Sequence, residues 1–423
     1  MILDEKERIG KQFLYTKIWE LRYYTLMKIS LNAQIFLGAL LGIVFGIIIG
    51  HTHLPSQTCT QLLFIFDLLG KIFINLLKII LVPLVFTSIT AGIANLKNSP
   101  RSGRIWPTLI FYSVTTTAFA AITGLIAMNF IKPGVGLDVH LFKDSMDSFQ
   151  VHSLTLKGFI AAISQNYIFA VIIFAVFVGL GIAALGEKSQ RILRLINDSF
   201  EITMTIVRWI MRVAPLGIMG LLTKLIAQQD LKLLLVLSKY ILVVVGTTLF
   251  HGLITLPIIL WLITGISPLK FFLCMKEAFI TAFSTSSSTA TLPVSLRCIT
   301  ENLGVDKNIA RFVLPVGATL NMDGTAMYEA MAALFVANLC GAHLTLLSQV
   351  IVMLTAMMAS IGAPGIPSAG MVTMIMVLQS VGLPAQAVAI LMAIDRPLDT
   401  IRTVVNVEGD CIGACVVQKI AKS

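Results

Sequence analysis

Apolar residues fill most of the chain in long stretches that are separated by short polar segments. About 20 consecutive apolar residues are enough for a helix that crosses the hydrocarbon core of a bilayer. Several stretches are longer than this, so we expect some of these helices to be tilted or broken. The pattern predicts an all-α polytopic membrane protein with eight transmembrane helices, near 32–50, 59–93, 105–131, 158–186, 195–226, 232–264, 308–340 and 384–417.

Two further apolar segments, 268–298 and 344–381, are interrupted near their middles by small and polar residues. The interruptions lie at 284–291 in the first segment and at 360–370 in the second. Lipid cannot satisfy the backbone groups of such a break, whereas a tip that is buried in protein or lines a watery cavity can. We therefore predict two re-entrant helical hairpins.

Each predicted hairpin is followed by a polar motif inside a span, Asn-Met-Asp at 321–323 and Asn-Val-Glu-Gly-Asp at 406–410. We expect the first hairpin to enter from the inner side of the membrane and the second from the outer side. This is the arrangement of inverted repeats, in which the broken segments surround a binding site.

Charged residues make up only 12% of the chain, against about 25% in soluble proteins. The 31 Lys and Arg residues lie mostly in short loops, as expected for loops on the cytoplasmic side, so they do not indicate a nucleic-acid partner. Loops 51–58, 341–347 and 382–386 contain no Lys or Arg, although 132–157 contains three lysines. We expect a multi-pass protein of the cell (inner or plasma) membrane, surrounded by lipid, with both termini cytoplasmic.

Residues 1–31 are mixed-charge and aromatic, without the apolar core and cleavage site of a signal peptide. We expect them to form a cytoplasmic amphipathic segment. The six cysteines and six histidines show no metal-binding spacing, and no organic cofactor is expected. His251, alone in an apolar run, is expected to be hydrogen-bonded inside the helix bundle.

The last span carries a polar stripe at 395–410. Ionisable groups at membrane depth are unfavourable by at least roughly 2.5–3.5 kcal/mol each, so the stripe must face protein or water. Arg402 suits a carboxylate and Asp399 suits an ammonium group, which together indicate a small charged solute. The alternative is an internal ion-pair ladder, which leaves part of the stripe unexplained. On a helix, one arc contains Asp395, Asp399, Arg402, Thr403, Asn406 and Asp410.

Oxygen-rich positions in two spans suit a hard cation. One set comprises the Asp410 carboxylate and the backbone near Asn406. In the other, Asn321, Asp323 and Thr325 alternate at period two, which is not helical spacing and predicts local unwinding. Unwound carbonyl groups bind Na⁺ in broken-helix transporters. The alternative is a polar kink without a ligand.

Two further features suit proton transport and anion binding, namely Glu329 and the first hairpin tip. Glu329 is a carboxyl group in an apolar setting, and because burial favours the neutral form it could carry a proton. The alternative is a structural glutamate that is permanently neutral or paired. The Ser/Thr-rich tip at 284–291 offers hydroxyl and backbone N–H groups to an anionic substrate group.

Four motifs carry a resemblance to a known family: STSSSTATLP, LPVGATLNMDGTAMYEA, SIGAPGIPSAG and DRPLDTIRTVVNVEGD. On these the chain is identified as a member of the dicarboxylate/amino acid:cation symporter family, which includes animal excitatory amino acid transporters and archaeal aspartate transporters. The resemblance covers most of the chain and is strongest over 268–418. It implies an elevator-type homotrimer. Residues 32–93 and 158–226 would form its scaffold and trimerisation domain, and residues 105–131 and 232–418 its transport domain.

The resemblance also implies an activity, which is secondary active import of L-glutamate or L-aspartate with Na⁺ and H⁺, and not an enzymatic reaction. Arg402 and Thr325 would meet the side-chain carboxylate, Asp399 the amino group and Asn406 the main-chain carboxylate. Glu329 matches the protonated glutamate of the animal members. The implied substrate positions are Ser286, Ser288, Thr325, Ile366, Gly370, Asp399, Arg402, Thr403 and Asn406.

Three Na⁺ sites are implied in the same way. The first would use Gly317, Asn321, Asn406 and Asp410. The second would use Thr319, Ser360, Ile361 and Ala363. The third would use Asn321, Asp323, Thr116 and Thr117.

The chain departs from the family pattern at three places. Ser113 stands where the third Na⁺ site usually has a tyrosine, with Tyr112 one position earlier. Archaeal members have an arginine at the position of Ser286, and animal glutamate transporters have one at that of Thr400. This chain has neither, but Arg396 lies one turn away from Thr400. Substrate affinity or release is therefore expected to differ.

Other activities remain as alternatives. A carrier of C4-dicarboxylates or neutral amino acids, coupled to H⁺ or Na⁺, is the nearest, but Asp399 favours an amino acid and Arg402 an acidic one. An intramembrane aspartyl protease built on Asp323 and Asp410 is disfavoured by their flanking sequences. A passive channel is disfavoured by the cation–anion pair in the stripe.

Overall fold

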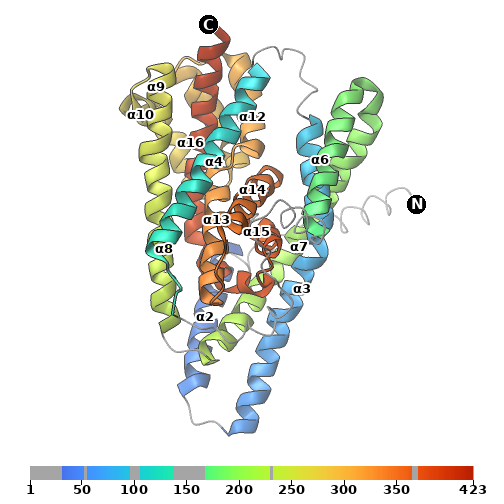
Figure 1. Cartoon of the computed structure of the whole chain (residues 1–423), viewed down its shortest axis with the longest axis vertical. Helices are drawn as coiled ribbons and strands as arrows, with labels where there is room; N and C mark the ends of the chain where they lie inside the picture. Colours follow the sequence, from blue (N-terminus) through green and yellow to red (C-terminus); the bar gives the residue numbers. More distant parts are fainter. Residues whose placement is uncertain are drawn as a thin grey trace, which may run out of the picture.

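The computed structural model describes residues 31–51, 55–95, 105–136, 167–228, 232–363 and 370–422, and every regular element within them is helical (Figure 1). Five stretches between Ala33 and Thr264 are long and apolar enough to cross a membrane. The predicted all-α class, with membrane-spanning helices, is therefore confirmed. The predicted spans at 308–340 and 384–417 are not among the five because the first is broken and the second carries the charged stripe.

A first group of helices consists of α2 (Leu31–His51), α3 (Ser56–Asn95), α6 (Tyr167–Leu185) and α7 (Gln190–Gln228). In this group α7 packs against both α2 and α3, and α3 packs against α6. The bounds agree with the predicted spans within a few residues. The exception is the start of α6, because residues 158–166 lie outside the described part of the chain.

Glycines at four-residue spacing bring α2 and α7 into close contact. A Cβ on Gly38 would lie 2.4 Å from the carbonyl oxygen of Pro215, and one on Gly42 would lie 2.7 Å from that of Met219. Small residues at this spacing let two helix backbones approach closely in a membrane, where van der Waals packing is a main source of helix association. The glycine stripe therefore fixes the position of α2 on α7.

The second group begins with α4 (Ile105–Ile131) and α8 (Lys232–Phe250). After α8 the helix continues through a π-helical turn, His251–Thr255, into α9 (Leu256–Thr264). At the centre of this group lies α13 (Asp323–Leu339), in which every residue except Asn338 is buried. Figure 1 shows α8 and α9 on the left, α3 and α6 on the right, and α13 between them.

The segment predicted as the first hairpin consists of α10 (Pro268–Thr285) and α11 (Ser288–Arg297). Ser286 ends α10 in the left-handed conformation with φ +49°, and the Ser287 side chain caps α11 by accepting from the N–H of Ala290. Serine at a helix N-cap satisfies one of the free N–H groups there. The polar tip thus provides the break that the sequence predicts.

Two further interruptions lie in the second half of the chain. Helix α12 (Lys307–Leu320) is separated from α13 by the unwound residues Asn321 and Met322, where the sequence predicts unwinding. The segment predicted as the second hairpin consists of α14 (Leu346–Gly362) and α15 (Gly370–Ser380). Residues 364–369 between them, which include the predicted substrate residue Ile366, lie outside the described residues. The chain ends in α16 (Val388–Lys422).

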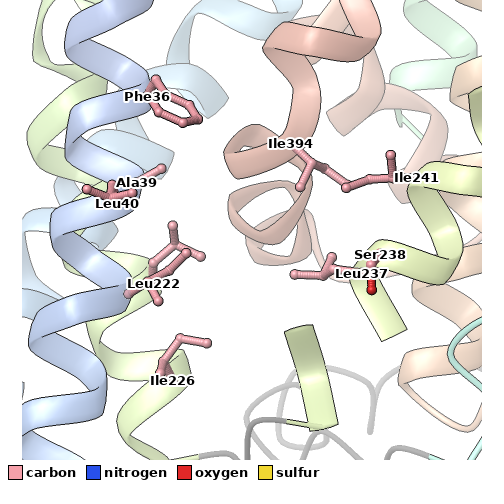
Figure 2. A pocket seen from close by; sticks show the side chains of 10 residues that line it. Phe36, Ala39, Leu40, Leu222, Ile226, Leu237, Ser238, Ile241 and Ile394 are labelled. Carbon is pink, nitrogen blue, oxygen red and sulfur yellow. The ribbon is translucent and has the colours of Figure 1, made fainter. Parts of the chain in front are cut away.

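An apolar cavity of about 190 Å³ separates parts of the two groups. Figure 2 shows Phe36 and Leu40 of α2 facing Leu237 and Ile241 of α8, with Ile394 of α16 beside them. Its lining is aliphatic and aromatic except for Ser238. Such a lining offers no counter-charge, so the chemistry of a charged solute must lie on another face of α16.

Candidate substrate and ion site

Arg402 lies in the middle of the polar stripe on α16. Its side chain is buried, with only 2% of the residue exposed, although a guanidinium group is charged at any physiological pH. Its Nη2 atom donates to Oδ1 of Asp395 at 2.9 Å and to Oδ1 of Asp399 at 2.7 Å. The guanidinium carbon lies 4.0 Å from the centre of the Tyr328 ring on α13. A buried arginine is tolerated only with such partners, and these three hold its head in one place.

A second arginine extends this network toward the surface. The Nη1 atom of Arg396 donates to Oδ2 of Asp399 at 3.0 Å. The ion pair between Asp399 and Arg402, which the sequence offers as an alternative reading of the stripe, is therefore present. It forms part of a four-membered ladder, Asp395–Arg402–Asp399–Arg396, but the ladder does not include Asn406 or Asp410.

Arg402 keeps unused hydrogen-bonding capacity despite its partners. Its Nε and Nη1 atoms are buried and have no hydrogen-bond partner among the described residues. A buried donor without a partner is unfavourable by about 1–3 kcal/mol, and more for a charged group. Two N–H directions of one guanidinium match the two oxygens of a carboxylate. The site therefore has the donors to bind a carboxylate-bearing ligand.

Asn406 and Thr325 join α16 to the start of α13 beside this arginine. The Asn406 side chain donates from Nδ2 to Oγ1 of Thr325 at 3.1 Å and accepts from the N–H of Gly324 at 2.8 Å. A Cβ on Gly324 would lie 2.8 Å from the carbonyl oxygen of Arg402. The glycine allows this approach, which brings together the predicted substrate residues of the two helices.

The remaining predicted substrate residues are less closely connected to Arg402 and Asn406. The Thr403 hydroxyl donates to the Asp399 carbonyl oxygen at 2.8 Å. Gly370 reaches the site from α15, since a Cβ there would lie 3.4 Å from Cγ2 of Thr325. At the first hairpin tip, the buried Oγ of Ser286 has no partner among the described residues, and Ser288 donates to the Ala318 carbonyl oxygen at 3.5 Å. Ser288 therefore ties this tip to α12.

A second cluster surrounds Asp323 at the break between α12 and α13. Its Oδ1 atom accepts from Thr116 at 3.2 Å and from Thr117 at 2.7 Å, and Thr116 also lies 3.1 Å from Oδ1 of Asn321. All four side chains are buried. The four residues predicted for the third Na⁺ site are thus gathered by α4 and the break. Their role as ligands stays a prediction.

Around Asp410 a third cluster forms, on the other side of the same break. Its Oδ1 atom is buried and makes no hydrogen bond of normal geometry among the described residues. A Cβ on Gly317 would lie 2.6 Å from this atom, and a Cβ on Gly409 would lie 2.4 Å from Nδ2 of Asn321. Gly317, Asn321 and Asp410 of the first predicted Na⁺ set therefore pack together, with a carboxylate oxygen that lacks a partner.

The second predicted Na⁺ set is not assembled by any side-chain bond. Thr319 is exposed and donates to the Val316 carbonyl oxygen at 2.9 Å. The Ser360 hydroxyl donates to Met357, and the Ser360 carbonyl oxygen accepts from the N–H of Ala363 at 3.1 Å. Ile361 is partly buried near the end of α14, which packs against α12. Thr319 therefore lies on α12, and the other three residues lie at the end of α14, which packs against α12. No hydrogen bond joins Thr319 to those three in the described part of the chain.

Glu329 is completely buried on α13, two turns below the break. Its Oε1 atom accepts from the Thr373 hydroxyl on α15 at 2.5 Å, and its Oε2 atom has no partner in the described part of the chain. A Cβ on Gly370 would lie 3.9 Å from Oε1. The predicted proton carrier thus contacts the helix that follows the second hairpin tip.

Several polar residues near the site were not predicted as part of it. His251, at the π-helical turn, lies with Nε2 3.3 Å from Oδ2 of Asp323, so its predicted hydrogen bond inside the bundle is confirmed. Glu408 is 2% exposed, and a Cβ on Gly252 would lie 3.1 Å from its Oε2 atom. The only signal for Glu408 in the sequence was a second acid inside the motif at 406–410.

Tyr112 and Ser113 clarify one departure from the family pattern. The Tyr112 hydroxyl donates to the carbonyl oxygen of Gly409 on α16 at 3.0 Å. The Oγ atom of Ser113 is buried and has no partner among the described residues. The tyrosine is therefore anchored to the backbone next to Asp410, and the neighbouring serine is too short to reproduce a phenol at its own position.

Comparisons with known proteins agree with this geometry. The profile of the Sodium:dicarboxylate symporter family matches residues 31–420. Excitatory amino acid transporter 3 of Mus musculus is 36% identical over 442 residues, covering 90% of this chain and 84% of the relative. Excitatory amino acid transporter 2 of Homo sapiens is 34% identical over 449 residues, covering 90% and 78%.

An invertebrate relative gives the same result. The excitatory amino acid transporter of Caenorhabditis elegans is 33% identical over 435 residues, covering 90% of this chain and 86% of the relative. These proteins are transporters and not enzymes, so the protease alternative is excluded. Together with the apolar helices, the match describes a multi-pass membrane protein, and the predicted resemblance is confirmed: the chain belongs to the sodium:dicarboxylate symporter family.

Proposed function

We propose that this chain is a secondary active symporter that imports L-glutamate or L-aspartate together with Na⁺ and a proton. The observation that carries the proposal is Arg402, whose buried Nε and Nη1 atoms have no partner among the described residues and lie on the same head that contacts Asp399. One ligand that brings a carboxylate and an ammonium group can satisfy both residues. The names of the relatives, which are excitatory amino acid transporters, support an acidic amino acid.

The substrate is held by groups from both hairpins and two spans. Arg402 and Thr325 bind the side-chain carboxylate, Asp399 binds the amino group with Thr403 beside it, and Asn406 binds the main-chain carboxylate. Ser286 and Ser288 close the site from the first hairpin, and Ile366 and Gly370 close it from the second. The bond between Asn406 and Thr325 supports this assignment because it keeps the two spans in register.

Na⁺ binds where oxygen atoms gather around the break in the 308–340 span. The first site is supported by the buried Oδ1 atom of Asp410, which makes no hydrogen bond of normal geometry among the described residues. The third is supported by the bonds of Thr116 and Thr117 to Asp323. A buried carboxylate without a counter-charge is strongly unfavourable, so a cation there stabilises the loaded protein. The second site uses backbone oxygens at the ends of α12 and α14.

A proton travels on Glu329. The bond with Thr373 and the absence of any positive partner for Oε2 among the described residues suit a carboxyl group that is neutral when the substrate is bound. Since Thr373 lies on α15, gain and loss of the proton are coupled to the position of the second hairpin.

The protein works as an elevator-type homotrimer with eight transmembrane helices, two re-entrant hairpins and both termini cytoplasmic. The α2, α3, α6 and α7 group is the scaffold, and the remaining helices move with the substrate. The apolar cavity between α2 and α8 supports this division, because aliphatic side chains on both sides leave few polar contacts to break when one helix group moves past the other.

The test is uptake of radiolabelled L-aspartate and L-glutamate into proteoliposomes. We expect uptake that depends on an inward Na⁺ gradient and that concentrates the amino acid inside the vesicles. Arg402→Met should abolish it, whereas Arg208→Met on α7, whose side chain is exposed and bonded to Thr205, should not. If the protein takes up neither amino acid, or if Arg402→Met takes up as much as the wild-type protein, the proposed function is rejected. If the amino acid crosses the membrane but is not concentrated inside the vesicles, the protein is a channel.

A further inference from the structure

The apolar cavity between the two helix groups has a buried floor and an exposed rim (Figure 2). Ala39 of α2, Leu222 of α7 and Leu237 of α8 form the floor, and they are 4%, 2% and 5% exposed. Phe36 and Leu40 of α2 form part of the rim, and they are 61% and 48% exposed. The cavity therefore opens on the outer surface of the helix bundle and is not sealed inside it.

The lining of the cavity suits an apolar ligand. Among the residues that the structure describes, no charged side chain lines it, and its one polar side chain is Ser238. The Ser238 hydroxyl donates to the Leu235 carbonyl oxygen of its own helix at 2.9 Å. The volume is about 190 Å³, and an apolar cavity of about 150 Å³ stays dry and takes up small apolar molecules. Water and charged solutes therefore find no partner here.

The opening of the cavity lies at the depth of the lipid tails. Its rim residues Phe36 and Leu40 belong to Ala33–Gly50, and its α8 residues belong to Leu235–Thr264. Both segments are long and apolar enough to cross a membrane. The hydrocarbon core of a bilayer contains no water, so the molecules that surround an exposed aliphatic surface at this depth are acyl chains.

We propose that the cavity binds one acyl chain of a membrane phospholipid, whose headgroup stays at the membrane surface. The chain contacts α2 and α7 on one side and α8 and α16 on the other, so that it bridges the two helix groups. The walls of an empty cavity lack van der Waals partners, and a flexible hydrocarbon chain supplies them. An unbranched chain can do so because it enters from the rim without bringing a polar group to the floor.

A chain in this position influences the movement of α16. Ile394 lines the cavity and directly precedes Asp395, whose carboxylate accepts from Arg402 at 2.9 Å. Because the walls belong to both helix groups, the cavity changes shape when one group moves past the other. A ligand that binds one arrangement better favours that arrangement. This effect on transport rests on the proposed function, whereas the binding of the chain does not.

The experiment uses a phosphatidylcholine with a photoreactive diazirine in its acyl chain, mixed into phosphatidylcholine vesicles that contain the full-length protein. After illumination, mass spectrometry identifies the labelled residues. Leu222 and Ile226 should be labelled although they are only 2% and 4% exposed, because the chain reaches them through the cavity. Ala214 of the same helix is 0% exposed and lies outside the lining, so it should stay unlabelled. Leu242 of α8 is 72% exposed and should be labelled by the surrounding lipid.

Two substitutions fill the cavity from opposite walls. In Ala39→Phe the added ring occupies the floor, and labelling of Leu222 and Ile226 should be lost while labelling of Leu242 remains. Ile241→Phe on α8 should have the same effect, so that a folding defect in one variant leaves the other to decide. If neither variant folds, the comparison of Leu222 with Ala214 in the wild-type protein decides.

Three results overturn the inference. The first is a wild-type protein in which Leu242 is labelled but Leu222 and Ile226 are not, and the second is labelling of these two residues that survives both substitutions. The third is labelling of the floor by a photoreactive free fatty acid but not by the phospholipid. If the same vesicles take up neither L-glutamate nor L-aspartate, the proposed function is rejected and the lipid site is not.

Discussion

The Thr373 hydroxyl donates to the Glu329 carboxyl group at 2.5 Å. This bond joins two helices through residues that are 44 positions apart in the chain. Thr373 lies one turn after the start of α15, whereas Glu329 is enclosed in α13. The proposed proton carrier is thus bonded to the helix that follows the second hairpin tip. Any movement of that helix changes the surroundings of the carboxyl group.

Glu329→Gln tests proton coupling. Wild-type uptake should fall as the pH rises, because the loaded carrier needs a neutral side chain at this position. Glutamine is neutral at every pH, so the variant should take up substrate with little dependence on pH over the same range. The measurement is initial uptake into proteoliposomes at a fixed Na⁺ gradient between about pH 6 and 9. A variant that keeps the wild-type pH profile contradicts the role of Glu329. Thr373→Val, which removes the hydrogen bond, should shift the profile without flattening it.

Tyr328→Leu tests the contribution of the ring that faces Arg402 at 4.0 Å. Cation–π contacts contribute about 0.5–2 kcal/mol, and we expect the dissociation constant of L-aspartate to rise by roughly 2- to 30-fold. Tyr328→Phe keeps the ring and should bind nearly as the wild-type protein does. Isothermal titration of the purified variants gives both values. Equal losses in Leu and Phe would show that the hydroxyl, and not the ring, matters.

Asp410→Asn should weaken Na⁺ binding without abolishing the fold. The Oδ1 atom of Asp410 is buried and makes no hydrogen bond of normal geometry among the described residues, so we expect a bound cation to be the main stabilising partner of this carboxylate. We expect the Na⁺ concentration for half-maximal L-aspartate binding to rise at least about tenfold, which corresponds to about 1.4 kcal/mol. Asp67→Asn on α3 is the control, because Asp67 pairs with Lys71 of α3 and Lys224 of α7, which belong to the first helix group and not to the candidate site. A Na⁺ dependence that shifts equally in both variants rejects a ligand role for Asp410.

Gly42→Ala should destabilise the contact between α2 and α7. The added Cβ would lie 2.7 Å from the Met219 carbonyl oxygen, and the two backbones must separate to accept it. Overpacking of this kind typically destabilises a protein by about 1–3 kcal/mol. Thermal unfolding in detergent measures the loss as a lower midpoint. Gly181→Ala on α6 is the matched control, since a Cβ there meets nothing within 4 Å. Equal midpoints for the two variants would contradict tight packing at Gly42.

Much of the fold follows from the sequence because membrane-spanning helices need long apolar runs. The limits of α4 coincide with the predicted span 105–131, and the unwound residues Asn321 and Met322 lie where the polar spacing stops being helical. The turn at Ser286 and Ser287 follows from the Ser/Thr-rich interruption. Each of these features depends on local chemistry, which a sequence displays directly.

The partners of the site residues were harder to predict. Helical periodicity places Asp395, Asp399 and Arg402 on one face, and their ion pairs follow from that spacing. It does not say which helix faces the stripe, so the ring of Tyr328 was not anticipated. The contact between His251 and Asp323 joins positions 72 residues apart. Such contacts depend on how the helices pack, and the pattern of a single segment does not determine packing.

The ladder of Asp395, Arg402, Asp399 and Arg396 has a consequence for the response to voltage. Moving one elementary charge through a potential of 100 mV involves about 2.3 kcal/mol of electrical work. Two guanidinium groups and two carboxylates sum to zero, so these four side chains add no gating charge when they move together. Among the described residues no Lys or Arg pairs with Asp323 or Asp410. In the proposed elevator movement, the electrical work is therefore determined by Asp323, Asp410 and the cations proposed to bind there, and not by the ladder.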